Sequence, residues 1–506
     1  MDYAKIGKHL LLPLAIVISC LPLLNPFSIF SDLRNSAFDI FQNISPRQSV
    51  SNESIIIIDI DDESLQKIGQ WPWPRNIVSK LVEKTNLSAV TAFDIVFAEP
   101  DRTGSKELKR LYKENKNLLK ALDTQVNNDD IFAMSIKQHK AVVLGSAPNN
   151  FESSVSINNK FGLVSQGDDP RLFLPKFKSM QSNLEILEKN AAGIGSMSIG
   201  NNDSVIRKLP LFESINGELI ASLPLEILRV AIGASTYQIK ASNASGENAF
   251  GENTGINHVK LSNLIIPTNA DGSIWIHYSN NLIKRVSAWE VLSDQINLNN
   301  FKDKIIIVGT SASGLFDLRS TPLNNNVPGV NIIAQLTDQI LTGHFLKRPD
   351  WMYGAELLSG LILALLITIT IQKLGPIGGL LIFVGGNFMS IYGSYYLFNS
   401  LKYLVDPISP LIICLFAYLI ITFFNFLFTE LERSKVRTAF SQYLSPEMVS
   451  KLAKSSETLK LGGEKKYMTF LFSDIRGFTS ISEQYKAKPE ELTDLINKLL
   501  TVLSDE

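Results

Sequence analysis

Four long apolar stretches interrupt an otherwise mixed pattern of hydrophobic and polar positions. They cover residues 10–30, 352–371, 376–397 and 407–428. Each stretch is close to the ~20 residues that a helix needs to cross the hydrocarbon core of a bilayer. Because helices satisfy their backbone polar groups internally, the pattern predicts one N-terminal and three C-terminal membrane-spanning helices, in contact with membrane lipid.

Basic residues indicate how these helices are oriented. They precede the first stretch, lie in the turn between the second and third, and follow the fourth: Lys5, Lys8, Lys373, Arg433, Lys435 and Arg437. All of them fall on one side of the membrane if residues 31–350 lie on the other side. By the positive-inside tendency, the side that carries the basic residues is the cytoplasm. Residues 1–9 are then expected to form a cytoplasmic head, and residues 31–350 to be extracytoplasmic.

The first apolar stretch has a second interpretation, a cleaved signal peptide. Val17-Ile18-Ser19-Cys20 resembles a lipoprotein cleavage site, in which Cys20 would carry the lipid. The apolar run continues past this cysteine to Leu24, which favours an uncleaved anchor. Both interpretations leave the orientation of the later helices unchanged.

Between the first and second apolar stretches, strand-like and helix-like patterns alternate. Residues 54–60 form a continuous β-branched run, as expected of a strand that is buried on both faces. The expected strands are 54–60, 89–97 and 304–308, and the expected helices are 75–86, 106–122 and 330–341, the second of them exposed and amphipathic. Residues 241–257 read as a surface loop. This alternation predicts an α/β domain with a largely parallel sheet.

Three carboxylates lie at or near the carboxyl ends of the expected strands, where open α/β sheets tend to place ligand sites. Asp59, Asp61 and Asp94 could together bind a cation or a polar ligand of the extracytoplasmic region. Alternatively they cap neighbouring helices or pair with Arg75 and Arg319. The structural interpretation is the simpler one, and the identity of any ligand stays open.

Composition excludes several classes of function. Lys and Arg total 48 against 49 Asp and Glu, so the basic excess of a nucleic-acid-binding protein is missing. The two cysteines, Cys20 and Cys414, lie in apolar stretches and provide no disulfide framework. Residues 309–314 lack the Gly-Lys-Ser/Thr ending of a phosphate-binding loop and predict a tight turn from a strand to a helix.

Residues beyond the fourth apolar stretch are polar and helical at first, over 430–440. Ser445 and Pro446 then fit the N-cap and first turn of a new helix. Residues 429–458 are therefore expected to be a cytoplasmic linker that carries movement of the membrane helices to an output domain.

The final part of the chain combines a strand pattern, an acidic residue and a glycine. Residues 467–472 alternate as a strand would, and Asp474 follows at the strand's end. Gly477 allows a close turn, after which Ser480 and Glu483 fit a capping box for a helix that begins at residue 479 or 480. A carboxylate, a glycine turn and free helix amides at this spacing suit a metal-bound nucleotide triphosphate.

Several short strings between the first two apolar stretches resemble the CHASE2 family of extracellular sensor domains. They are residues 71–75 (WPWPR), 93–100 (FDIVFAEP), 202–210 (NDSVIRKLP), 307–330 and 346–349 (LKRP). One departure is Ser204, where the family more often has glycine. The resemblance covers nearly all of residues 31–350. It implies three following membrane helices and a cytoplasmic output domain, which is the order found here.

The run of residues 459–483 resembles the opening of class III adenylate and guanylate cyclase domains. The resemblance implies that residues 459–506 begin an α+β, ferredoxin-like catalytic domain in a multi-pass protein of the bacterial inner membrane. The family's second metal-binding aspartate, its base-selecting pair and its transition-state residues are expected further along than Glu506. The 506-residue chain on its own is then expected to be inactive.

The same resemblance implies individual roles. The family's aspartate at Asp474 binds both catalytic divalent cations, Mg²⁺ or Mn²⁺, and the residue at Ile475 supplies a backbone carbonyl to one of them. Amides around Gly477, Phe478 and Thr479 hold the phosphates of the nucleotide. The expected reaction converts ATP to cyclic AMP and pyrophosphate.

Alternative outputs are a guanylate cyclase and a non-catalytic sensor whose degenerate cyclase end only dimerises. A diguanylate cyclase is disfavoured, because Gly462-Gly463-Glu464 is followed by lysine rather than by the Glu-Phe of that family's signature. The cyclase resemblance implies catalytic sites shared between two chains, hence a homodimer. A candidate seam between the chains consists of Leu431, Val436, Phe440 and Tyr443.

Overall fold

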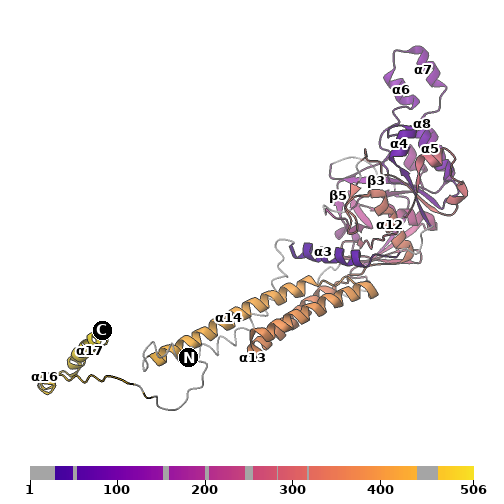
Figure 1. Ribbon diagram of the computed structural model, residues 1–506. Helices are drawn as coiled ribbons and strands as arrows, with labels where there is room; N and C mark the ends of the chain where they lie inside the picture. The colour runs from indigo at the N-terminus through magenta and orange to yellow at the C-terminus, as the bar shows by residue number, and fades with distance from the viewer. Residues whose placement is uncertain are drawn as a thin grey trace. The chain divides into compact units, whose positions relative to one another are not determined.

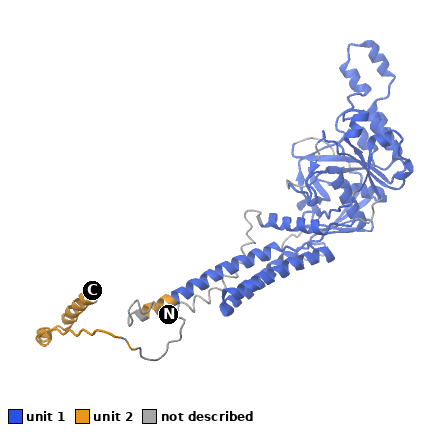
Figure 2. Cartoon of the chain, in the orientation of Figure 1, with its two compact units in different colours: residues 1–432 blue, residues 433–506 orange. Residues whose placement is uncertain are grey.

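The computed structural model describes residue 17 and residues 29–48, 54–151, 159–199, 204–244, 255–281, 283–315, 318–441, 465 and 467–505. The chain divides into two compact units, residues 1–432 and residues 433–506 (Figure 2). Most of the expected apolar stretch 10–30 and the expected helix start at Pro446 lie outside the described residues.

A seven-stranded sheet forms the centre of the first unit (Figure 1). In order across the sheet, the strands are β15 (Lys284–Ser287), β1 (Ile55–Ile60), β16 (Ile305–Thr310), β2 (Val90–Phe93), β3 (Val142–Asn149) and β6 (Ser179–Gln181), and β7 (Gly193–Ser196) also pairs with β3. All neighbours are parallel except β3 and β6. The predicted α/β domain with a largely parallel sheet is therefore confirmed.

Alternate side chains of the central strands enter two separate cores. Ile55 and Ile57 pack in one core with helices α10 (Leu223–Ile232) and α12 (Gly329–Thr342). Ile56 and Ile58 pack in the other core, with α5 (Arg75–Lys84), α8 (Asn128–His139), α9 (Glu185–Asn190) and α11 (Ala288–Leu292). Because both faces are covered by helices, the strands are apolar throughout rather than alternating with polar residues.

Smaller antiparallel and mixed sheets flank the first core. One has the order β13 (Leu264–Pro267), β12 (Ile256–Leu261), β11 (Thr236–Ala241) and β4 (Gly162–Gln166), and another has β10 (Glu218–Ala221), β9 (Phe212–Ile215) and β5 (Lys176–Phe177). Pairs are formed by β14 (Ser273–Trp275) with β8 (Lys208–Pro210) and by β17 (Leu318–Arg319) with β18 (Val327–Pro328). Short 3-10 turns η1 (Pro170–Leu172) and η2 (Leu298–Phe301) complete this part.

Three local expectations need correction. The expected helix 106–122 is two helices, α6 (Ser105–Leu111) and α7 (Lys116–Asp123), because the Asn115 side chain accepts a hydrogen bond from the Leu118 amide and starts a new helix. The expected strand 89–97 stops at Phe93, the last residue paired with a neighbouring strand. The turn after β16 leads toward the short strand β17 and not directly into a helix. Figure 1 shows α6 and α7 projecting from the α/β domain.

The expected surface loop 241–257 lies between two paired strands. Its ends belong to β11 and β12, which pair as an antiparallel hairpin. Residues 245–254 of this loop are outside the described residues. The structure therefore tests the predicted loop only at its two ends.

The second and third apolar stretches form α13 (Trp351–Tyr396), which is broken at Gly375 by a left-handed backbone conformation (φ 77°, ψ −177°). A side chain on Gly386 would meet Leu363 at 2.8 Å, so the two arms of α13 run back along each other. The π-helical turn η3 (Leu397–Leu401) follows, and the fourth stretch forms α14 (Ile408–Ser441). Two helices of the described chain, Trp351–Leu401 and Ile408–Ala439, are long and apolar enough to cross a membrane.

Beyond α14, the described residues of the second unit form two helices, α16 (Phe478–Gln484) and α17 (Pro489–Asp505). The expected strand 467–472 is extended and exposed but is not part of a sheet. A strand becomes stable through a hydrogen-bonded neighbour, and none is present here among the described residues. Helix α16 begins at Phe478, directly after Gly477 with φ 78°, which is earlier than the capping box Ser480–Glu483 predicts.

Candidate functional site

Asp59 lies buried at the carboxyl end of β1, 1% exposed. Its Oδ2 accepts hydrogen bonds from Arg285 Nη1 at 2.7 Å and from Ser311 Oγ at 2.6 Å. Its Oδ1 has no hydrogen-bond partner within the described part of the chain. Burial raises the pKa of Asp59 above its ordinary value, against the opposing effects of Ser311 and Arg285. The ion-pair partner is thus an arginine of the adjacent strand β15 rather than the expected Arg75 or Arg319.

Asp61 lies just beyond Asp59 and caps helix α4 (Asp62–Ile68). Its Oδ1 accepts hydrogen bonds from the Ser64 amide at 2.8 Å and from Ser287 Oγ at 2.9 Å. The backbone amide of Asp94 donates to the Val308 carbonyl at 2.8 Å. In the part of the chain that the structure describes, no group of three or more His, Cys, Asp or Glu side chains could hold a metal ion.

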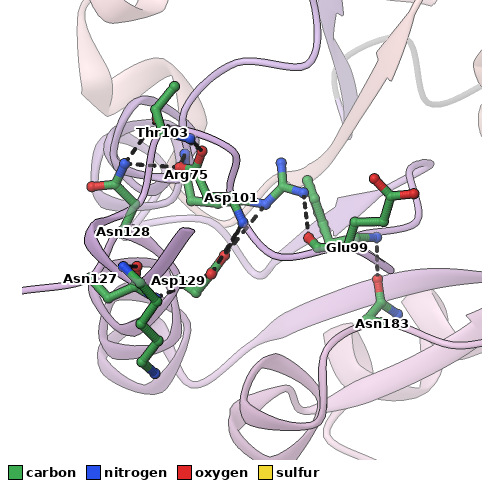
Figure 3. Close-up of polar contacts among 10 residues, drawn as sticks. Arg75, Glu99, Asp101, Thr103, Asn127, Asn128, Asp129 and Asn183 are labelled. Carbon is green, nitrogen blue, oxygen red and sulfur yellow. Dashed lines mark hydrogen bonds and ion pairs between the residues drawn. The ribbon is translucent and has the colours of Figure 1, made fainter. Parts of the chain in front are cut away.

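A second polar cluster surrounds the buried Asp101 (Figure 3). The Asp101 Oδ2 accepts hydrogen bonds from the Arg75 amide at 2.6 Å and from Asn128 Nδ2 at 2.9 Å. Its Oδ1 accepts from the amide and the hydroxyl of Thr103 at 2.8 and 2.9 Å. We call Arg75, Asp101, Thr103, Asn128 and Asp129 the Asp101 cluster.

Asp129 completes the Asp101 cluster from the first turn of α8. It accepts hydrogen bonds from the Asp101 amide at 3.2 Å and from Asn127 Nδ2 at 3.2 Å, and it lies 3.9 Å from Arg75 Nε. The Arg75 guanidinium stacks on the Phe97 ring at 4.6 Å. The cluster therefore joins the starts of α5 and α8 to the loop after β2, and its carboxylates are already occupied by protein groups.

Asn183 extends this polar network toward the sheet (Figure 3). Its Oδ1 accepts from the Phe97 amide at 2.7 Å, and its Nδ2 donates to the Gly145 carbonyl at 2.9 Å. The sequence analysis singled out the Trp-Pro-Trp-Pro-Arg and Phe-Ala-Glu-Pro strings but did not predict that they meet. The sequence feature that could have indicated this contact is Asp101, an acidic residue directly after the second string.

The residues expected to bind nucleotide lie in the second unit. Asp474 is exposed, and its Oδ1 accepts a hydrogen bond from the Ile475 amide at 2.8 Å. Gly477 makes the turn into α16, in which Phe478 and Thr479 are the first two residues. The described part of this unit brings no second carboxylate into a metal-binding group with Asp474. A two-metal site is therefore not formed by these residues alone.

The CHASE2 domain family matches residues 14–371 of the chain. The chain belongs to the CHASE2 family. CHASE2 is an extracellular sensor domain, so the α/β domain is the sensor part of the molecule. No curated protein and no solved structure matches the chain.

The CHASE2 domain contacts the apolar helices directly, just before α13 begins. Lys347 pairs with the segment that follows η3: its amide donates to the Lys402 carbonyl at 2.8 Å, and its carbonyl accepts from the Leu404 amide at 2.9 Å. Arg348 forms two 2.8 Å hydrogen bonds with Glu356 of α13, and this carboxylate also accepts from the Asp406 amide at 2.7 Å.

An apolar cluster reinforces this junction. It includes Phe38 and Phe41 of helix α3 (Ile29–Ile44), Trp275 of β14, and Phe398 of η3. The Phe41 and Phe398 rings lie 5.8 Å apart, and the Phe38 and Trp275 rings meet edge to face at 5.7 Å. Helix α3, the sensor domain and the apolar helices therefore share one packed interface.

We expect Asp101→Asn to destabilise the CHASE2 domain by about 1–3 kcal/mol at neutral pH, because it removes a buried acceptor of several hydrogen bonds. Burial opposes the charge of Asp101, but bonds from the Arg75 and Thr103 amides outweigh it, so its pKa is lowered from 3.8. The wild-type advantage is present above pH 3.8 and is lost as the pH falls through the lowered pKa. Thermal unfolding of the full chain across pH measures this difference.

The control is Asp123→Asn. The Asp123 side chain is 66% exposed and forms a surface ion pair with Lys109. It is expected to change stability little at any pH. Equal effects of the two substitutions would contradict the structural role given to Asp101.

Proposed function

We propose that this chain is a membrane-anchored receptor in which the CHASE2 sensor controls a class III nucleotide cyclase that converts ATP to cyclic AMP. The observation that carries the output assignment is the run Ser473–Ser480, which follows a CHASE2 domain and its apolar helices in one chain. A guanylate cyclase differs only in the base of the nucleotide, and assays with both nucleotides separate the two.

The junction supports the proposed topology. Because Lys347 pairs with residues 402–404, the connection between α13 and α14 belongs on the sensor side of the membrane. The break at Gly375 lies at the far end of the two antiparallel arms, next to the basic Lys373. With three C-terminal crossings and one N-terminal crossing, the proposed topology has residues 31–350 outside and the cyclase segment inside.

Helix α14 provides a route for the signal. It is 34 residues long, about 50 Å at 1.5 Å per residue, which exceeds the ~30 Å hydrocarbon core. Its first turn is fixed at the junction, where Asp406 accepts hydrogen bonds from the Ile408 amide at 2.8 Å and from the Ser409 hydroxyl. A displacement at the junction would therefore be carried along a continuous helix toward the cytoplasm.

The proposed chemistry requires more than the described segment supplies. Asp474 offers one exposed carboxylate, a type of oxygen ligand that Mg²⁺ and Mn²⁺ prefer. When bound, such cations lower the pKa of a ribose hydroxyl and neutralise charge on a departing pyrophosphate. Further ligands must come from other parts of the full-length protein or from a second chain, which favours a homodimer.

The helix that follows the fourth apolar stretch offers a surface for this pairing. Leu431 and Val436 are 51% and 55% exposed on α14. The side chains of Phe440 and Tyr443, the other members of the expected seam, lie outside the described side chains. Two exposed apolar residues facing a second copy would bury surface that is otherwise in water.

A cysteine-labelling experiment tests the topology. In a background with Cys20→Ser and Cys414→Ser, we expect an impermeant maleimide to label Thr124→Cys in intact cells, because this exposed residue follows α7 of the sensor. Gln484→Cys, exposed at the end of α16, is expected to be labelled only after the membrane is opened. Labelling of Gln484→Cys in intact cells would rule out the proposed orientation.

Substitution of Asp474 tests the output. In the full-length protein, Asp474→Asn is expected to lower cyclic AMP production at least about 100-fold, because loss of a group that stabilises transition-state charge has effects of this order. Membrane insertion and thermal stability should stay unchanged. Asp494→Asn in the exposed face of α17 is the matched control and should keep full activity. Near-normal turnover of Asp474→Asn would exclude the metal-ligand role.

Complementation tests the shared site. We expect co-expression of a full-length Asp474→Ala chain with a chain altered only in its downstream transition-state residues to restore part of the activity. One of the two shared sites would then combine intact halves from both chains. Co-purification of differently tagged chains verifies that they assemble. Assembly without any recovered activity would contradict a site shared between chains.

A further inference from the structure

A cavity of about 230 Å³ lies between helix α3 and strands β8, β9 and β14 of the sensor domain. Its wall includes residues 205–208, part of the Asn-Asp-Ser-Val-Ile-Arg-Lys-Leu-Pro string, to which the proposed function gives no role. The polar side chains that matter here are Arg34, Asn35, Lys208, Glu213 and Trp275.

Four of these lining residues each have a buried polar atom that finds no hydrogen-bond partner among the described residues. The atoms are Arg34 Nε, Asn35 Oδ1, Glu213 Oε1 and Trp275 Nε1. Buried polar groups in folded proteins are nearly always hydrogen-bonded, and each exception calls for an explanation. Two of the four atoms are donors and two are acceptors, so one small ligand that both accepts and donates would satisfy them.

Glu213 is the most unusual member of the wall. It is 1% exposed, and its Oε2 accepts a 2.6 Å hydrogen bond from the Ser196 hydroxyl. Burial raises the pKa of this carboxyl group, against the opposing hydrogen bonds from Ser196 and Ser198. The buried carboxylates of Glu226 and Glu356 each have a guanidinium partner, whereas the buried Glu188 is bonded to Asn183. Within the described residues Glu213 has no ion-pair partner, so a ligand ammonium group would complete it.

The remaining charged residues of the wall are Arg34, Arg207, Lys208 and the acidic Asp271. Arg207 forms hydrogen bonds of 2.8 and 2.7 Å with Asp39 of α3, and Lys208 Nζ lies 4.3 Å from the centre of the Trp275 ring. Arg34 adds a third positive charge from α3. Burial and the nearby Arg348 lower the pKa of Arg34, against the opposing effects of Asp406 and Glu356. Its Nε still has no hydrogen-bond partner among the described residues, so an acceptor beside it would be favourable.

We propose that this cavity binds a small zwitterion of the α-amino acid class, with its ammonium group toward Glu213 and its carboxylate toward Arg34. The volume is below the roughly 300 Å³ at which sites for drug-sized ligands begin, which suits a single amino acid. A neutral polyol could satisfy the four polar atoms as well. It would leave the buried Glu213 without a cation.

Such a ligand would contact both helix α3 and the strands of the sensor that face it. Arg34 and Asn35 belong to α3, whereas Glu213 and Lys208 belong to strands β9 and β8. Phe41 on the same helix packs against Phe398 of the junction. Occupation of the cavity would therefore draw α3 toward the strands and change its packing against the apolar helices. This inference rests on the CHASE2 sensor and not on the proposed cyclase.

Binding is tested with the full chain in lipid nanodiscs by thermal shift and isothermal titration calorimetry. The probes are the twenty common amino acids, with glycerol and glucose as neutral comparators. We expect at least one free amino acid to raise the unfolding temperature. Its N-acetyl derivative, which lacks the ammonium, and its methyl ester, which lacks the carboxylate, should each bind at least about tenfold more weakly.

The decisive variant is Glu213→Gln, which keeps the shape and removes the charge, and it should weaken binding at least about tenfold. Glu188→Gln is the matched control: Glu188 is also buried, accepts a 2.9 Å hydrogen bond from the Asn183 amide and does not line the cavity. If Glu213→Gln does not fold, Arg34→Gln replaces it as the binding variant.

Three results would overturn the proposal. They are the absence of binding by all twenty amino acids, equal binding of the N-acetyl derivative or of a neutral polyol, and unchanged affinity in the folded binding variant. Each readout is binding to the sensor, so it is independent of whether the full-length protein makes cyclic AMP.

Discussion

The ion pair between Arg348 and Glu356 joins the sensor to the apolar helices. Both side chains are largely buried, with exposed fractions of 13% and 2%. Removing one partner of such a pair leaves an unpaired buried charge, at a cost of about 3–5 kcal/mol. Glu356 also accepts from the Asp406 amide, so a single carboxylate connects the end of the sensor, the start of α13 and the approach to α14.

Three buried carboxylates of the sensor are paired with arginines. Asp59 pairs with Arg285, Asp338 with Arg47, and Glu226 with Arg229. In each pair a guanidinium offsets the desolvation of a carboxylate, as burial requires. Glu188 and Glu213 depart from this pattern, because the hydrogen bonds given for them come from Asn183 and from serine hydroxyls. Of these two, Glu213 is the one that lines the cavity with Arg34 and Lys208.

Segments with strong local patterns were predictable. The β-branched run at residues 55–60 could be recognised as a buried strand, and the second to fourth apolar stretches as long helices, because these patterns arise from the segments themselves. The turn between the second and third apolar stretches was also predicted, and the chain makes it at Gly375, which has a positive φ. The run 467–472 has an equally clear strand pattern but no strand forms, because pairing depends on a neighbour that the segment does not contain.

The candidate sites show the corresponding limit. Motif strings in the sequence identified a CHASE2 sensor, and the residue types at 474–479 suggested nucleotide chemistry, since both are carried by adjacent residues. The partner of Asp59 lies 226 positions away at Arg285, and Arg34 and Glu213 line one cavity only because α3 packs on the strands. Such pairings depend on which elements become neighbours in space. Local residue patterns specify the elements and their buried faces, whereas long-range packing specifies which charged side chains meet.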